Sequence, residues 1–146
     1  TKFKSSTAQY SDAEMKKKGL NPVYMGKSSG DLIGKSWKAM KKKNTKQMQD
    51  IMNAAVAMWG KHAKKQQSKL SSLPGKTAAR KYEALNTTGL IVFIMAETYA
   101  KKGMKAEAKK YYQLAKKHYS YSQAWDRKGW WWAIAKGCDK KMARLK

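Results

Sequence analysis

The chain has 146 residues, of which 42% are hydrophobic, and this is enough for one compact domain with its own core. Its 33 lysines and arginines face only 9 acidic residues, so the formal net charge is +24 at pH 7. A compact body with this excess repels itself, so the expected partner is a polyanion: nucleic acid, an anionic membrane surface, or an acidic protein or polysaccharide. The single cysteine, Cys138, excludes an internal disulfide and a cysteine-based zinc site.

The longest apolar run, Leu90 to Ala96, is far shorter than the roughly 20 residues of a membrane-spanning helix, so no membrane span is expected. The sequence contains no secretory signal. It begins at Thr1 rather than methionine, which is compatible with removal of an N-terminal segment and with export. The compartment is therefore left open, with an extracellular or periplasmic location favoured over a cytoplasmic one.

Residues 1–30 are expected to form an extended arm. Their apolar residues are scattered without a sustained period, and the pair Asn21-Pro22 predicts a turn. Ser11 and Glu14 match the capping box that begins a helix, so a short helix is expected to start there and to end at Gly19. The arm would lie on the rest of the protein or on a partner.

Residues 31–146 are expected to form a single domain of paired helices. Asp31 precedes apolar residues at helical spacing and predicts a helix, with Asp31 as its cap, that ends near Lys43. A second helix, capped by Thr45 and ending at about Gln67, is expected to be the longest. The apolar face of this second helix consists of Met48, Ile51, Met52, Ala55, Met58 or Trp59, and Ala63.

The stretch from Ser68 to Gly75 contains serines and a Pro-Gly pair and predicts a turn or short linker. A basic amphipathic helix is expected from Thr77 to Asn86, and the residues up to Gly89 are expected to interrupt it. The alternative is one continuous helix over residues 76–100, with Gly89 tolerated at a cost of about 1 kcal/mol relative to alanine. The spacing does not decide between the two.

From residue 89 to residue 137, apolar residues recur at helical spacing in three segments, separated by Gly103 and by residues 120–122. This predicts three helices folded back on one another. In the third helix, the consecutive Trp130, Trp131 and Trp132 would cover about 200° of surface and cannot all enter one core. Trp130 and Trp131 are therefore candidates for contact with another element of the fold, with a partner or second copy, or with bases or sugars.

The same stretch resembles the tetratricopeptide repeat, a pair of antiparallel helices of about 34 residues whose copies stack into a superhelix. The residues at the small, aromatic and glycine positions of the repeat are Ala96, Tyr99, Gly103, Ala108, Tyr112 and Ala115. A truncated second unit would contain Trp125, Gly129, Trp132 and Gly137, and residues 31–67 are weakly similar. The resemblance implies an all-α fold of five to six helices, in antiparallel pairs stacked as a short solenoid, and a binding scaffold.

Lysines flank every expected helix. At about 100° per residue, Lys105, Lys109 and Lys116 form one stripe beside the apolar side of their helix, and Lys110 and Lys117 form another. Solubility needs a net charge of only about 2 to 8, so binding is favoured over mere solvation. The candidate nucleic-acid-binding residues are Lys35, Lys38, Lys41, Lys42, Lys61, Lys64, Lys65, Lys76, Arg80, Lys81, Lys105, Lys109, Lys110, Lys116 and Lys117.

Arginine is rare in this chain and occurs only as Arg80, Arg127 and Arg144. Lysine is a flexible point charge suited to phosphates, whereas arginine reads guanine edges, so binding would be largely independent of base sequence. The sequence therefore favours a protein that binds and coats nucleic acid, DNA rather than RNA, and associates with itself along the polymer. The alternative is a tetratricopeptide-like scaffold that binds an acidic protein or an anionic envelope surface.

No residues form a convincing catalytic or metal site. His62 and His118 are expected on the surface, and neither has a second ligand at metal spacing. The acidic residues are expected to cap helices or to pair with lysines, and an acid–base pair of Glu97 with Asp126 is the less favoured alternative. No enzymatic activity, cofactor or small-molecule substrate is expected.

Overall fold

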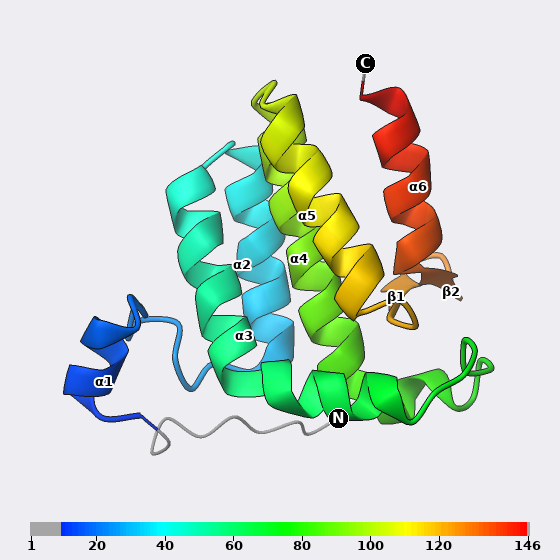
Figure 1. Ribbon diagram of the computed structural model, residues 1–146, viewed down its shortest axis with the longest axis horizontal. Helices are drawn as coiled ribbons and strands as arrows, with labels where there is room; N and C mark the ends of the chain where they lie inside the picture. Colours follow the sequence, from blue (N-terminus) through cyan, green and yellow to red (C-terminus); the bar gives the residue numbers. More distant parts are fainter. Residues whose placement is uncertain (1–9, 146) are drawn as a thin grey trace.

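The computed structural model describes residues 10–145, and these fold mainly into α-helices that pack against one another (Figure 1). The all-α class expected from the sequence is confirmed, with one small two-stranded sheet added to it. In chain order the elements are α1 (Asp12–Lys17), α2 (Ser29–Lys41), α3 (Thr45–Ser68), the 3₁₀ helix η2 (Ala79–Tyr82), α4 (Glu83–Lys101), α5 (Lys105–His118), β1 (Gln123–Asp126), β2 (Trp130–Ala133) and α6 (Ile134–Arg144).

Helix α4 is the centre of the fold. Every residue from Ala84 to Ala96 is buried, which explains why the sequence of this helix has no pronounced polar face. The helices α3 and α5 pack along α4, α2 packs against both α3 and α4, and α6 packs against α5 (Figure 1). Despite its apolar character, neither α4 nor any other helix in residues 10–145 is long and apolar enough to cross a membrane.

Gly89 lies in the middle of α4 and does not interrupt it. A Cβ atom at this position would lie 2.6 Å from the Cβ of Ser122, which belongs to the turn between α5 and β1. The Ser122 hydroxyl donates a hydrogen bond to the Tyr119 carbonyl at 2.6 Å and so holds that turn in place. The expected break before Gly89 is therefore wrong, because this glycine permits close packing of the turn on a continuous helix.

The hairpins α2/α3 and α4/α5 have turns of the same geometry. The residue after the C-cap is left-handed in both, with φ of 55° at Lys43 and 78° at Gly103. The next amide, that of Asn44 or Met104, donates to the carbonyl five residues earlier at 2.9 Å. These bonds define a Schellman motif. Glycine signals the second turn in the sequence, whereas lysine, which rarely adopts a left-handed conformation, does not signal the first.

Side chains cap α2 and α3 one to three residues earlier than the sequence suggested. Ser28 rather than Asp31 caps α2, since its hydroxyl accepts a hydrogen bond from the Asp31 amide at 3.2 Å. Asp31 instead stands in the first turn, where a negative charge stabilises the helix N-terminus. Asn44 rather than Thr45 caps α3.

The N-terminal segment lies on the body of the protein, which is one of the two positions expected for it. Helix α1 begins with the expected capping box, in which Ser11 and Glu14 exchange hydrogen bonds of 3.1 and 3.2 Å. The Tyr10 hydroxyl donates to the Ala57 carbonyl of α3 at 3.2 Å. The residues of this segment that are buried in the common core are Met15, Leu20, Tyr24 and Met25. Residues 1–9 of the expected arm lie outside the described residues.

The expected helix from Thr77 to Asn86 is wrong. Residues 79–82 form a 3₁₀ helix, and α4 begins directly after it. The buried side chain of Asn86 donates to the Ala79 carbonyl at 2.9 Å and accepts the Gln123 amide at 2.8 Å. Asn86 thus holds η2 and β1 against α4 by tertiary hydrogen bonds, which helical spacing in the sequence does not reveal.

The expected third helix of residues 89–137 is also wrong, because its first part is a β-hairpin. Strands β1 and β2 pair antiparallel, with Trp125 opposite Trp131. In the loop between them, the Asp126 carboxylate accepts the Lys128 amide at 2.8 Å, and Gly129 has a φ of 105°. Aspartate and glycine favour such a short loop, and tryptophan favours strands.

The truncated second repeat unit is overturned by this hairpin. Trp125 and Trp132 lie in strands and Gly129 in the loop, so Gly137 alone of its four residues is helical. Gly137 is packed closely, since a Cβ there would lie 2.9 Å from the Trp132 ring. Trp132 itself packs edge-on against Phe93 of α4, at 5.4 Å between ring centroids.

Replacing Tyr112 by phenylalanine is expected to lower the free energy of unfolding by about 1.5–3 kcal/mol, the usual range for a hydrogen bond to a charged group. The Tyr112 hydroxyl donates to the Glu97 carboxylate, which also pairs with Lys141 of α6 at 3.2 Å. Burial and the Glu97 contact raise the pKa of Tyr112 and keep its hydroxyl protonated. Stability should accordingly fall as the pH rises above about 10.

Urea unfolding of Tyr111→Phe is the matched control. Tyr111 donates to the neutral Gln49 side chain at 3.2 Å, so its loss should cost only about 0.5–1.5 kcal/mol. Equal losses in the two variants would contradict a charged hydrogen bond between α4 and α5.

Candidate nucleic-acid interface

All the candidate cations lie at the surface, and every one except the half-buried Lys35 is exposed. They come from separate elements. Those of α2 (Lys38, Lys41 and Lys42) lie toward its C-terminal end, at the top of Figure 1, far from the second half of α3. The structure therefore distributes the candidates over several surfaces, which differ in how many acidic residues accompany them.

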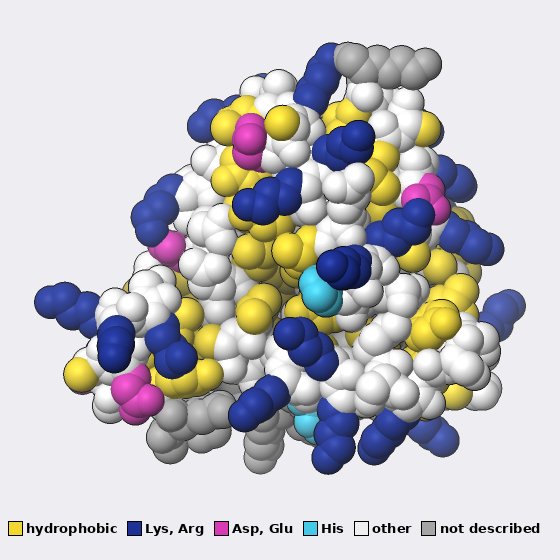
Figure 2. Space-filling view, in the orientation of Figure 1, with side chains coloured by type: hydrophobic (Ala, Val, Ile, Leu, Met, Phe, Trp, Pro, Cys, Tyr) yellow, Lys and Arg dark blue, Asp and Glu magenta, His cyan; other side chains and the backbone are white. Residues whose placement is uncertain are grey.

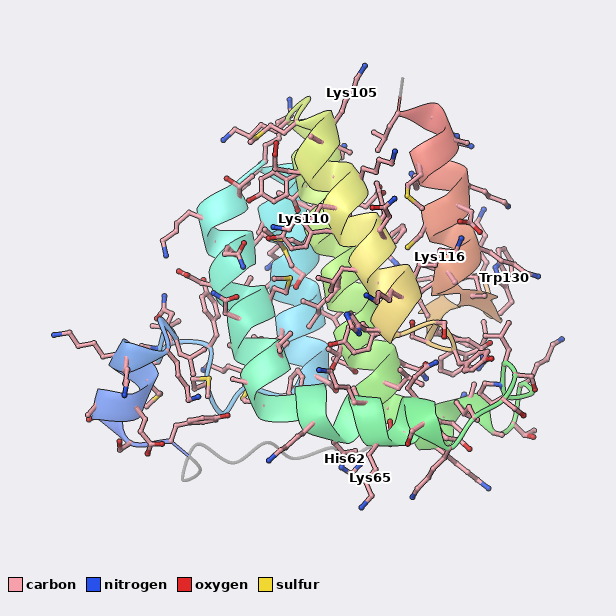
Figure 3. All side chains as sticks on the ribbon, in the orientation of Figure 1. His62, Lys65, Lys105, Lys110, Lys116 and Trp130 are labelled. Carbon is pink, nitrogen blue, oxygen red and sulfur yellow. The ribbon has the colours of Figure 1, made fainter. Side chains whose placement is uncertain are left out.

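A positive surface without acidic residues in its own segment follows the second half of α3. Helix α3 changes direction near its middle, and the part that carries His62 and Lys65 runs along the lower edge of the molecule (Figures 1 and 3). No acidic residue occurs between Asp50 and Glu83. We call residues 61–81 the lower basic edge. Its cations are Lys61, Lys64, Lys65, Lys69, Lys76, Arg80 and Lys81.

Helix α5 carries a second group of candidates on the same side of the molecule. Figure 2 shows basic side chains spread over this face with few acidic ones between them, and Figure 3 places Lys105, Lys110 and Lys116 along α5. Lys116 is paired with Asp139 at 2.6 Å, and the Lys110 ammonium lies 5.4 Å from the centre of the Tyr111 ring. The ion pair of Lys116 thus neutralises part of the charge of α5, whereas the segment of the lower basic edge contains no acidic residue.

Lys35 on α2 is also neutralised locally. Its ammonium pairs with Asp31 at 2.9 Å, and this hydrogen bond lowers the pKa of the Asp31 carboxyl and keeps it ionised. Such an exposed pair contributes little to stability but reduces the field that Lys35 offers to a phosphate.

The tryptophans of the hairpin point to both of its faces. Trp130 is 48% exposed and Trp125 is 50% exposed, while Trp131 is half-buried and packs edge-on against Trp125 at 5.4 Å (Figure 3). Trp130 is thus accessible to a partner. Trp125 lies beside Trp131 because the two residues are opposite each other in the paired strands. Reading an Asp-x-x-Gly loop between tryptophan-rich segments would have revealed this arrangement.

A cavity of about 380 Å³ opens between the hairpin and the helices. Of the candidate residues only Arg80 and Trp131 line it, so the sequence did not predict this site. It is formed by the start of α2, by η2, by the first turns of α4 and by β1 and β2. Its lining residues are Ser29, Gly30, Ile33, Arg80, Glu83, Asn86, Thr87, Leu90, Gln123, Ala124, Trp125 and Trp131.

The acidic residues and histidines considered for acid–base chemistry or metal binding make other contacts or lie at the surface. Glu97 bonds to Tyr112 and Lys141, and Asp126 holds the hairpin loop, so the suggested pair of these two acids is not formed. His62 and His118 are exposed, as expected. Residues 10–145 contain no group of three or more histidine, cysteine, aspartate or glutamate side chains that could hold a metal ion.

The thiol of Cys138 is expected to be unreactive in the folded protein. It is fully buried, and burial, reinforced by Asp139 and Glu97, raises its pKa from 9.0 to about 12. Alkylation by iodoacetamide near pH 8 should therefore be on the order of 1000-fold slower in native protein than in the urea-unfolded chain. Comparable rates in the two states would show that α6 opens readily from α4 and α5.

No protein-family model matches this chain, and no curated protein or solved structure matches it either. The surfaces described above are therefore the basis for a functional proposal.

Proposed function

We propose that this protein binds nucleic acid, DNA in preference to RNA, without enzymatic activity and largely without regard to base sequence. The observation that carries the proposal is the lower basic edge, in which seven cations follow one another with no acidic residue (Lys61 to Lys81). Lysine side chains contact phosphates as point charges and release the counterions condensed on the polymer, which favours binding to any sequence.

The lysines of α5 would extend the same surface upward. Lys105, Lys109, Lys110 and Lys117 are exposed, and α5 lies on the face that adjoins the lower basic edge (Figure 2). A duplex or a single strand lying on the lower edge would bring its phosphates within reach of the lower part of α5. Trp130, which is 48% exposed at the start of β2, would contact a neighbouring copy of the protein on the same polymer.

The salt dependence of DNA binding tests this proposal. If all seven cations of the edge contact phosphates, log affinity should fall with log salt with a slope of about −6, that is, roughly 10⁴-fold between about 50 and 200 mM. Fluorescence anisotropy of a labelled duplex measures this slope. Binding that is insensitive to salt would contradict the proposal.

The packing of the helices favours a second candidate, a repeat scaffold for an acidic protein or an anionic envelope surface. The hairpins α2/α3 and α4/α5 share one turn geometry, and α4 packs against both helices of the preceding hairpin, as in stacked helical repeats. This candidate predicts that heparin competes with DNA at equal charge and that one acidic peptide binds with defined stoichiometry. Preference for DNA over heparin would favour the first proposal.

A further inference from the structure

The cavity beside the hairpin has flat apolar walls. Trp125 and Trp131 stand on one side, and Ile33 and Leu90 contribute aliphatic surface. Half of Trp125 remains exposed, although Trp131 packs against it in a T-shaped arrangement with 5.4 Å between the ring centroids. An aromatic ring that is held by a neighbouring ring and still half exposed is suited to stack against a planar ligand.

The inner end of the cavity offers hydrogen-bonding groups that the protein does not use. Thr87 is only 4% exposed, lines the cavity, and its hydroxyl has no hydrogen-bond partner among residues 10–145. In the same helix, the Thr98 hydroxyl donates to the carbonyl one turn earlier at 2.7 Å. Gln123 is 8% exposed and donates from Nε2 to the Pro74 carbonyl at 3.0 Å, which leaves its Oε1 as an acceptor. A ligand with matching groups would gain hydrogen bonds from the Thr87 hydroxyl and the Gln123 Oε1 here.

The cavity adjoins the lower basic edge through Arg80. Arg80 lines the cavity with its guanidinium 5.8 Å from the centre of the Trp125 ring, and the exposed Lys76 and Lys81 are its neighbours in the chain. The same short segment therefore places cations for phosphate contact beside an aromatic wall. Proteins that bind single-stranded nucleic acid combine these two features.

We propose that this cavity is a pocket for one unpaired nucleobase of a single strand whose phosphates lie on the lower basic edge. The inference rests on the proposed function and adds a base contact to it. A base has the planar faces that Trp125 can stack on and polar edges that Thr87 and Gln123 can bond. A neutral sugar would use the tryptophan but not the cations, and an acidic peptide would use the cations but not the stacking wall.

The test compares two strands of about 12 nucleotides, one of mixed sequence and one abasic, with identical phosphate charge. The base-bearing strand should bind roughly 5- to 150-fold more tightly, which corresponds to one stacked base. Trp125→Ala should abolish this preference and leave the affinity for the abasic strand unchanged. Thr87→Val, which removes the hydroxyl and retains the shape, should reduce the preference in part.

Trp130→Ala is the matched control, because Trp130 lies in the same hairpin with similar exposure but outside this cavity. Because the proposed contact of Trp130 with a neighbouring copy would change the affinity for both strands alike, this variant should retain the preference for bases whatever its overall affinity. Equal affinities of the wild type for both strands, or a Trp125→Ala variant that weakens both strands alike, would overturn the pocket while leaving phosphate binding intact. A wild type that binds neither strand would overturn the proposed function as well. Unchanged thermal unfolding midpoints establish that the variants are folded.

Discussion

Replacing Gly89 by alanine is expected to destabilise the protein by about 1–3 kcal/mol, even though alanine is the better helix former by about 1 kcal/mol. The added Cβ would lie 2.6 Å from the Cβ of Ser122 and 3.1 Å from that of Tyr119. Both contacts are made by atoms next to the backbone, so the turn of residues 119–122 would have to move away from α4. Urea unfolding followed by circular dichroism measures the change.

Gly34→Ala is the control for helix propensity. Gly34 is exposed in α2, and a Cβ at this position would meet no atom within 4 Å. This variant should be more stable than the wild type by about 0.5–1 kcal/mol. If Gly89→Ala were stabilising by the same amount, the turn after α5 would not pack on α4 as the structure shows.

The largest expected effect on binding comes from the lower basic edge. Replacing Lys61, Lys65 and Lys81 together by glutamine should make the slope of log affinity against log salt less negative by about 2.7, or 0.9 for each lost phosphate contact. At about 50 mM salt the affinity for DNA should fall roughly 10-fold or more. Fluorescence anisotropy over a series of salt concentrations measures both quantities.

The control for this triple variant changes the net charge by the same amount at the opposite end of the molecule. Glutamine at Lys38, Lys41 and Lys42 removes three cations near the C-terminal end of α2 (Figure 1). This variant should keep most of the slope, because a strand on the lower edge does not extend to that end. Equal effects of the two triple variants would mean that overall charge rather than the lower basic edge determines binding.

The helices were predictable where a periodic apolar face coincides with local stop signals. The faces of α2 and α3, the capping box of α1 and the glycine turn after α4 are of this kind, and they depend on neighbours within one or two turns. The hairpin was missed because Trp125 and Trp132 lie seven residues apart, a spacing that also fits one face of a helix. In the structure, Asp126 and Gly129 close a short loop, and the preference of tryptophan for strands then decides the outcome.

The candidate site was predictable in its charge but not in its shape. The lysines were identified correctly as surface residues, since a net charge of +24 cannot be buried. Which of them remain without acidic partners depends on contacts between distant elements, such as Lys116 with Asp139. The cavity joins residues from α2, η2, α4 and the hairpin, and helical spacing within any one of these segments carries no information about the others.

By itself, the sequence determined the all-α class, most of the helices and the polycationic surface, because periodicity, capping and charge are properties of neighbouring residues. The tertiary structure decided that α4 passes unbroken through Gly89, that residues 123–133 form a hairpin and that Arg80, Thr87 and Trp125 line one cavity. The physical reason is the same in each case. These features depend on close packing and hydrogen bonds between segments far apart in the chain. The intrinsic preferences of single residues for helix or strand differ by only about 1 kcal/mol, so these tertiary contacts decide the conformation.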